Sequence, residues 1–288
     1  MFAAIRRERT KNVKSSVGIS RLLSCRAEWK NKFFAPFCRI EEQQCGGAKY
    51  LLVTLSKFPD NANQRLKKIL FRHCGTAHIR MVPEEGIPLF PPFRSELFMR
   101  LLLFNTTLHI MERLGQKQEE IPVILIDIRG VAAGFIPKLA CCCKQVCVIT
   151  CRPERYARRQ QQLIWEEGIA ITVTAPRQHI VNLGLCLVAD DGGGMFNSIF
   201  PETGIILRCC GSSQREKDFT LASIEAPEWA AQQIPPGFSP ITFLGAVYEY
   251  GREERCGKIS VSELKDYNGN SITIEELIDK LQNKSFIS

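Results

Sequence analysis

The segment Val123–Asp127 most constrains the fold, because four consecutive aliphatic residues end abruptly in a carboxylate. Unbroken apolar runs of this length are typical of strands buried on both faces of a parallel sheet. A glycine-containing turn follows, then a predicted helix over about 135–143 and a second apolar strand, Val146–Thr150. Neighbouring parallel strands need such a crossover connection. This β-α-β unit predicts an α/β protein.

Strand and helix patterns alternate along much of the remaining chain. Apolar strands are predicted over 49–55, 78–82, 169–174, 185–189 and 204–208, and helices over about 61–75, 95–113 and 153–167. Near the C-terminus, Asn268–Gly269 predicts a hairpin turn, and Thr273 with Glu276 forms a capping box for a last helix. Repeated units of this kind predict a doubly wound, mostly parallel sheet.

The turn after Asp127 is the candidate ligand site. In the Gly-x-Gly-x-x-Gly fingerprint, the first glycine makes a tight turn and the second lets the backbone approach a pyrophosphate. The third permits close packing of helix and strand. Gly130 and Ala133 can occupy the second and third positions, followed by Gly134, but Ile128 stands at the first. The fingerprint is therefore degraded.

Arg152 follows the second strand and lies 22 residues after Gly130. In dinucleotide-binding folds this strand tip meets the adenosine ribose, where an acidic residue accepts the hydroxyls and an arginine suits a 2′-phosphate. The tip carries no carboxylate, although Glu154 is close. If a dinucleotide binds, we expect NADP before NAD.

Residues 122–175 resemble the Rossmann-type NAD(P)-binding domains of shikimate dehydrogenase and glutamyl-tRNA reductase. The resemblance covers about a fifth of the chain and rests on Gly130, Ala133, Gly134, Thr150 and Arg152. It implies a Rossmann-like fold, an NAD(P) cofactor and an oxidoreductase. Nothing before Pro122 matches the substrate-binding motifs of those enzymes. The resemblance therefore supplies no catalytic residue.

A second loop joins Asp190 and Asp191 to three glycines, and it follows a predicted strand on the side where parallel sheets bind ligands. Paired carboxylates can hold a cation, activate water or accept a substrate hydroxyl, or they can belong to a flexible acidic turn. We expect both to face the second half of the cleft. The sequence predicts no metal site, because the EF-hand-like segment 266–276 is a residue short and lacks the required glycine.

The sequence predicts four segments along the 288 residues. They are a basic N-terminal extension (1–47), an α/β N-terminal half (48–120), a Rossmann-like half (121–211), and a linker with a small C-terminal appendage (212–288). Residues 1–42 contain ten basic and four acidic side chains, so most of the net charge of +8 lies there. We expect a solvated arm. Nucleic acid is not favoured as a partner, because neither a basic helix face nor an aromatic stacking platform accompanies it. A protein partner remains open.

Two functional interpretations follow. Either the chain binds a nucleotide-type ligand, with an oxidoreductase as one consequence, or the glycines only connect strand to helix in a non-catalytic scaffold or regulatory protein. Ile128 favours the second interpretation. No apolar run approaches the ~20 residues of a membrane span, and the N-terminus lacks a secretory signal pattern, so we expect a cytoplasmic protein with reduced cysteines.

Overall fold

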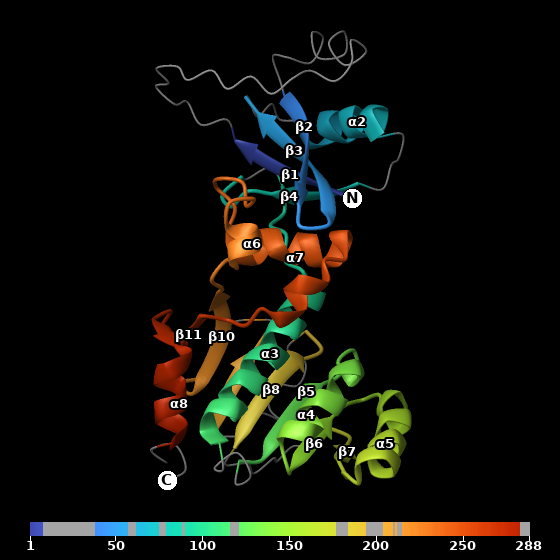
Figure 1. The fold of residues 1–288 in the computed structure, drawn as a ribbon, viewed down its shortest axis with the longest axis vertical. Coiled ribbons are helices and arrows are strands. Elements are labelled where there is room, and N and C mark those ends of the chain that lie inside the picture. Colours follow the sequence, from blue (N-terminus) through green and yellow to red (C-terminus); the bar gives the residue numbers. More distant parts are fainter. Residues whose placement is uncertain are drawn as a thin grey trace. The chain divides into compact units, whose positions relative to one another are not determined.

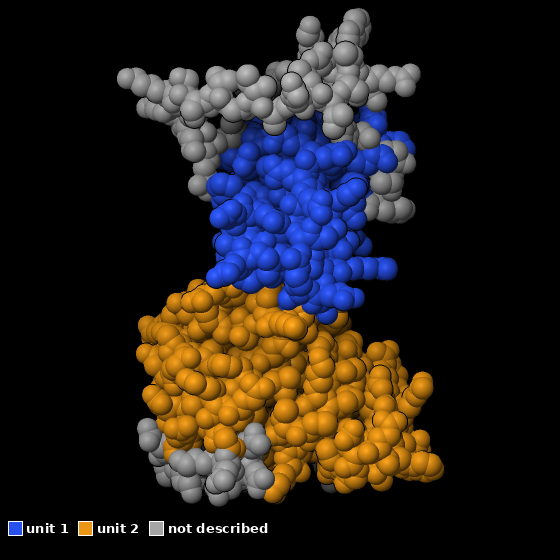
Figure 2. Space-filling view, viewed as in Figure 1, with its two compact units in different colours: residues 1–95, 226–256 blue, residues 96–225, 257–288 orange. Residues whose placement is uncertain are grey.

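The fold is known from a computed structural model (Figure 1). The structure describes residues 1–7, 38–56, 62–74, 79–87, 90–115, 121–176, 184–193, 204–209, 211 and 215–282. The chain forms two compact units (Figure 2). Unit 1 comprises residues 1–95 and 226–256, and unit 2 comprises residues 96–225 and 257–288. None of the helices in the described ranges combines the length and the hydrophobicity that a transmembrane segment requires.

Unit 1 is built on a four-stranded sheet of order β2-β3-β1-β4. Strand β1 runs parallel to both β3 and β4, whereas β2 forms an antiparallel hairpin with β3. Helix α2 (Ala62–Cys74) packs on one face, and α6 (Glu228–Ala231) and α7 (Pro240–Gly251) complete the unit. The strands are β1 (Phe2–Arg7), β2 (Cys38–Cys45), β3 (Ala48–Leu55) and β4 (Arg80–Pro83).

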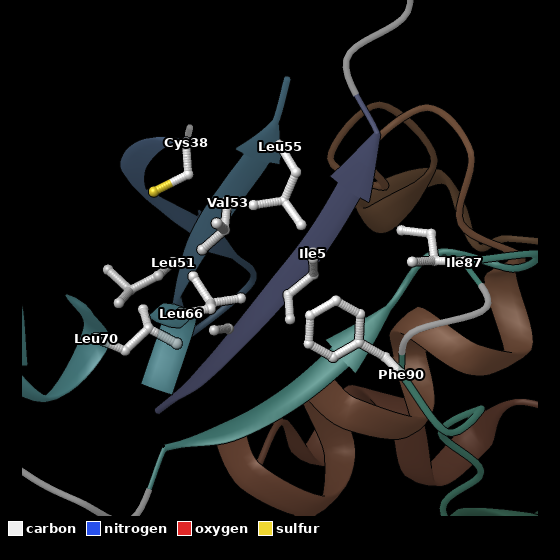
Figure 3. Close-up of a cluster of buried hydrophobic side chains, with 10 residues drawn as sticks. Ile5, Cys38, Leu51, Val53, Leu55, Leu66, Leu70, Ile87 and Phe90 are labelled. Carbon is white, nitrogen blue, oxygen red and sulfur yellow. The ribbon is translucent and has the colours of Figure 1, made fainter. Parts of the chain in front are cut away.

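Alternation of side chains along the strands gives unit 1 two apolar layers. Ile5 and Val53 point toward Leu66 and Leu70 of α2 in one buried cluster (Figure 3). Phe2 has the opposite parity to Ile5, and its ring stacks on Tyr50 with centroids 5.4 Å apart, against α7. The sheet therefore separates an aliphatic core from an aromatic one.

The structure corrects the predicted basic extension at both of its ends. Residues 2–7 and 38–45 are strands of the unit 1 sheet, and the four residues from Phe2 to Ile5 are fully buried. Arg6 and Arg7 come only at the end of β1, where Arg6 Nε donates to Thr54 Oγ1 at 3.0 Å. The prediction counted the charge of residues 1–42 as a whole. The short apolar strand at the start of this range was therefore not recognised. Residues 8–37 lie outside the described residues.

Unit 2 contains an eight-stranded sheet of order β12-β11-β10-β9-β8-β5-β6-β7. Strands β5 to β10 are mutually parallel, and β11 and β12 extend one edge as an antiparallel hairpin. Numbered along the chain, the six parallel strands have the order 3-2-1-4-5-6, which is the doubly wound order of dinucleotide-binding sheets. The predicted α/β class with a doubly wound, mostly parallel, Rossmann-like sheet is confirmed. The strands are β5 (Val123–Asp127), β6 (Val146–Ile149), β7 (Thr172–Thr174), β8 (Leu185–Asp190), β9 (Ile205–Arg208), β10 (Asp218–Ser223), β11 (Glu263–Lys265) and β12 (Ser271–Thr273).

Four α-helices accompany this sheet in the described residues of unit 2: α3 (Glu96–Leu114), α4 (Ile136–Cys142), α5 (Glu154–Glu167) and α8 (Ile274–Gln282). Helix α3 packs against α4, α8, β8 and β10. The predicted capping box is confirmed, because the Thr273 amide donates to Glu276 Oε2 at 2.9 Å and the Glu276 amide donates to Thr273 Oγ1 at 3.2 Å. The predicted hairpin is also present, and the Asp266 carboxylate accepts backbone N–H groups inside its turn.

The two compact units do not coincide with the four predicted segments. Residues 226–256 belong to unit 1 and residues 257–288 to unit 2, although both ranges lay in the predicted linker and appendage. The physical reason is long-range packing: α7 lies against β1 and β3, which precede it by about 200 residues. Local sequence patterns do not indicate contacts between residues so far apart in the chain.

Glu253, two residues after α7, ties the hairpin between β2 and β3 to the end of the helix. Its carboxylate accepts the side-chain Nε–H of Arg255 at 2.8 Å and the backbone N–H of Gly47. These hydrogen bonds, the one from the Arg255 side chain first, lower the pKa of Glu253 to about 2. The Arg255 guanidinium also lies 4.4 Å from the centre of the Trp229 ring, which holds it in place.

We expect Glu253→Gln to flatten the acid side of the stability curve. Because the folded pKa of Glu253 lies below its usual value, its contribution is complete above about pH 4.5 and is lost as the pH falls toward 2. The variant lacks that contribution at neutral pH and has less to lose in acid. Urea unfolding at several pH values measures the slope. Glu254→Gln controls for the changed net charge, and equal slopes in wild type and Glu253→Gln would contradict the assignment.

Candidate functional site

The candidate site lies at the carboxyl ends of β5 and β8, where the strand order of the unit 2 sheet reverses. These two strands are neighbours and run parallel, and the register brings Asp127 opposite Asp190. Open α/β sheets bind ligands just outside such a switch point. The first turn of the predicted nucleotide site and the first residue of the predicted acidic loop therefore meet at one place.

The Asp127 carboxylate is fully buried and folds back over the turn that follows it. Its Oδ1 accepts the backbone N–H of Val131 at 3.0 Å, and its Oδ2 accepts that of Ala132 at 2.7 Å. The hydroxyl of Tyr156, a buried residue of α5, donates a hydrogen bond to the same Oδ2. Burial, and then the neighbouring Asp127 charge, raise the pKa of Tyr156, so the hydroxyl remains a donor at physiological pH.

Three more amides of the turn are also occupied from within the chain. The N–H of Gly130 donates to the carbonyl oxygen of Asp127 at 3.1 Å. The N–H of Ile128 donates to the carbonyl oxygen of Asp190 at 3.1 Å, and that of Arg129 to Asp190 Oδ2 at 2.8 Å. Every amide from 128 to 132 thus has an internal acceptor. In a dinucleotide-binding turn, amides of this kind face a pyrophosphate.

Asp190 is buried and engaged by Arg129. Arg129 Nε lies 3.0 Å from both carboxylate oxygens, and its Nη2 lies 2.8 Å from Oδ1. Burial by itself would raise the pKa of Asp190, but hydrogen bonds from the side chain and backbone of Arg129 outweigh it and lower the pKa. Asp190 therefore remains a carboxylate that anchors the turn after β5.

Asp191 is placed in the short turn after β8. Its Oδ1 accepts the N–H of Gly193 at 2.9 Å, and its Oδ2 lies 3.9 Å from Nη1 of the buried Arg208. Gly192 and Gly193 both have positive φ, at 66° and 76°, which is the conformation that favours glycine. Gly194 lies outside the described residues.

Gly130 and Arg152 are neighbours in space, as their spacing in the sequence suggested. Gly130 has a φ of 70°, and a Cβ built there would lie 3.1 Å from Cβ of Arg152 and 2.7 Å from Cδ of Arg155. The start of α5 therefore packs directly onto the glycine. The Arg152 side chain is 63% exposed and lies 3.9 Å from Glu154.

The two remaining predicted residues, Ala133 and Gly134, belong to a 3-10 turn, η2 (Ala133–Phe135), that leads into α4. A Cβ built on Gly134 would meet nothing within 4 Å, so this glycine faces open space. Within the described ranges, no group of three or more His, Cys, Asp or Glu side chains is placed to hold a metal ion.

The residues that organise the turn were not among those predicted. They are Asp127, Tyr156 and Arg129, and Asp127 is the centre of the network. One signal was present in the sequence: a carboxylate ends an otherwise apolar strand directly before a glycine turn, and such a group needs buried partners. The partner Tyr156 lies 29 residues further on, beyond the reach of local pattern.

Comparisons with known proteins give distant likenesses in fold. No protein-family model and no curated protein matches the sequence. Among solved structures, L-tryptophan dehydrogenase from Nostoc punctiforme aligns with a TM-score of 0.33 at 12% identity, over 73% of this chain and 66% of that chain.

Two further structures have similar values. The ligand-free form of 5-ketofructose reductase from Gluconobacter sp. strain CHM43 aligns with a TM-score of 0.32 at 9% identity, over 89% of this chain and 96% of that one. An Ael1 enzyme from Pseudomonas putida aligns with a TM-score of 0.29 at 9% identity, over 91% and 99%. At these values no activity and no functional residue is transferred to this chain.

Proposed function

We propose that this chain is a non-catalytic, Rossmann-like scaffold or regulatory protein whose glycine turn is closed to dinucleotides. One observation carries the proposal: the Asp127 carboxylate takes up the backbone N–H groups of Val131 and Ala132. A buried anion placed there occupies the hydrogen bonds that a pyrophosphate needs. It also repels a second negative charge at close range.

The residues present do not fit a dinucleotide in the manner of the fingerprint. Opening the turn would separate Asp127 from two amides and from the Tyr156 hydroxyl, and Asp190 from the Arg129 amide. Each buried polar group that loses its partner costs roughly 1–3 kcal/mol. The contacts of a bound cofactor would have to offset the free energy of all these lost hydrogen bonds. No chemical step is therefore assigned to NADP or NAD.

The alternative function is binding of a nucleotide-type ligand, NADP before NAD, by an oxidoreductase. Three features favour it: the 3-2-1-4-5-6 strand order, the positive φ of Gly130, and the exposed Arg152 next to that glycine. All three are compatible with a closed turn, because fold does not determine function and because Gly130 is needed for the turn itself. The two functions differ in one respect: a dinucleotide needs the amides of Val131 and Ala132, and the Asp127 carboxylate already accepts their hydrogen bonds.

We expect NADP, NAD and ATP to leave the melting temperature of the full chain unchanged. A ligand at about a hundred times its dissociation constant adds about 2.7 kcal/mol, which raises the melting temperature of a domain of this size by about 5–10 °C. Differential scanning fluorimetry with each nucleotide at millimolar concentration measures the shift.

A stabilisation by NADP that is absent in Arg152→Asp would overturn the scaffold proposal in favour of the NADP site. Arg152 suits this test because its side chain is 63% exposed and its contact with Glu154 is a long one of 3.9 Å, so we expect its replacement to spare the fold. Lys138→Asp, at an exposed position of α4, provides the matched reversal of charge away from the strand tip.

A further inference from the structure

We propose that the exposed face of helix α2 in unit 1 binds single-stranded nucleic acid, with one base stacked on Phe71 and the phosphates held by Lys67, Lys68 and Arg72. This inference is independent of the glycine turn in unit 2. It rests on the side chains that α2 presents to solvent and on the ones that it buries.

The geometry of α2 places an aromatic ring at the centre of its solvent face. Successive helical residues are rotated by about 100°, which puts Lys67 and Lys68 within about 60° of Phe71 on either side. The Phe71 side chain is 52% exposed, an unusual position for a residue of this type. Leu66 and Leu70 occupy the opposite side and are buried in the unit 1 core (Figure 3).

The charged side chains that α2 itself carries around Phe71 are all basic, and Glu42 of β2 lies near Cys74 at the C-terminal end of the helix. Helix α2 contains no acidic residue, and among the described residues Lys67, Lys68 and Arg72 make no ion pair. Lys68 and Arg72 are four positions apart, a like-charge arrangement that destabilises a helix by a few tenths of a kcal/mol. An ordinary solvated helix face mixes acidic with basic side chains. A helix whose own charged side chains are all cations beside an exposed ring matches a polyanion with stackable groups.

The burial of α2 favours nucleic acid over an anionic membrane as the partner. Membrane-surface helices insert a whole apolar face into the headgroup region. Here the apolar face of α2, including Leu66 and Leu70, is covered by the sheet. The ring of Phe71 is the large apolar side chain of the helix that stays exposed. One ring flanked by cations suits base stacking together with phosphate contacts.

The contrast with α5 shows what is specific to α2. Trp165 on α5 is 87% exposed, yet it lies beside Glu166 and Glu167 and on a helix that begins with Glu154. Acidic neighbours repel phosphates. Nucleic acid was not favoured from the sequence because neither a basic helix face nor an aromatic platform accompanies the N-terminal arm. Helix α2 presents both.

The test uses the full chain and fluorescence anisotropy with a fluorescein-labelled oligothymidylate of about 15 nucleotides. We expect wild-type protein to bind at low salt and Phe71→Ala to weaken binding about tenfold or more, with Phe71→Trp retaining it. Lys67→Gln/Lys68→Gln should reduce the slope of log affinity against log salt by about 1.4, which corresponds to two lost phosphate contacts. These side chains are exposed, and circular dichroism verifies the fold of each variant.

Trp165→Ala is the matched control, and it should leave oligonucleotide affinity unchanged. Absence of binding by wild-type protein overturns the proposal, as does equal affinity of Phe71→Ala and wild type. Binding to phosphatidylserine vesicles that is lost in Phe71→Ala, without binding to the oligonucleotide, overturns it in favour of a membrane surface.

Discussion

Replacing Asp127 with alanine is expected to lower the free energy of unfolding by about 3–5 kcal/mol. The change leaves the amides of Val131 and Ala132 and the hydroxyl of Tyr156 without their acceptor. Each group is at or near a buried position, where an unsatisfied donor costs roughly 1–3 kcal/mol, and a water molecule entering the small space recovers part of the loss. Urea denaturation monitored by circular dichroism measures the difference.

Two further variants separate the network from the general effect of removing a carboxylate. Asp127→Asn keeps one side-chain oxygen as an acceptor and should lie between wild type and Asp127→Ala. Asp191→Ala removes a carboxylate from the turn after β8 that accepts the amide hydrogen bond of Gly193, and it should cost about 1 kcal/mol. A loss below about 1 kcal/mol for Asp127→Ala would mean that the turn does not depend on its carboxylate. The main support for the scaffold proposal would then disappear.

The sequence alone predicted the fold of unit 2 well, because the evidence for it is local. The apolar run of β5, the glycine turn, α4 and β6 follow one another without interruption, and buried parallel strands have a distinctive composition. The capping box at Thr273 and the Asn268–Gly269 turn are likewise set by residues within a few positions of each other. Such features can be recognised without knowledge of the tertiary structure.

Features that depend on distant partners were missed. Strand β1 has only four buried residues, and it becomes recognisable as a strand only through its pairing with β3 and β4. The contacts inside the candidate site could not be predicted for the same reason. The glycine pattern showed where a turn would form, but whether its amides are free depends on the direction of the Asp127 side chain, on Tyr156 from α5 and on Asp190 from β8. These contacts are set by the tertiary structure and not by the local sequence.

The second large effect is expected from the ion pair between Arg208 and Asp218, on the neighbouring strands β9 and β10. Arg208 Nε lies 2.8 Å and 2.7 Å from the two carboxylate oxygens, and the two side chains are 2% and 0% exposed. Asp218→Ala should lower the free energy of unfolding by about 3–5 kcal/mol, because a buried guanidinium loses its bidentate anion and keeps the Asp191 carboxylate at 3.9 Å. Urea denaturation measures this loss.

A double substitution tests whether the loss arises from the unbalanced charge or from the lost packing. Arg208→Met combined with Asp218→Leu removes both charges while filling similar volume, and buried pairs replaced in this way are often no less stable. We therefore expect the double variant to be more stable than either single variant, with a coupling energy of about 1–3 kcal/mol in the double-mutant cycle. If the two losses simply add, Arg208 and Asp218 contribute independently through packing. The electrostatic interaction between the two side chains would then make no measurable contribution to the stability of the sheet.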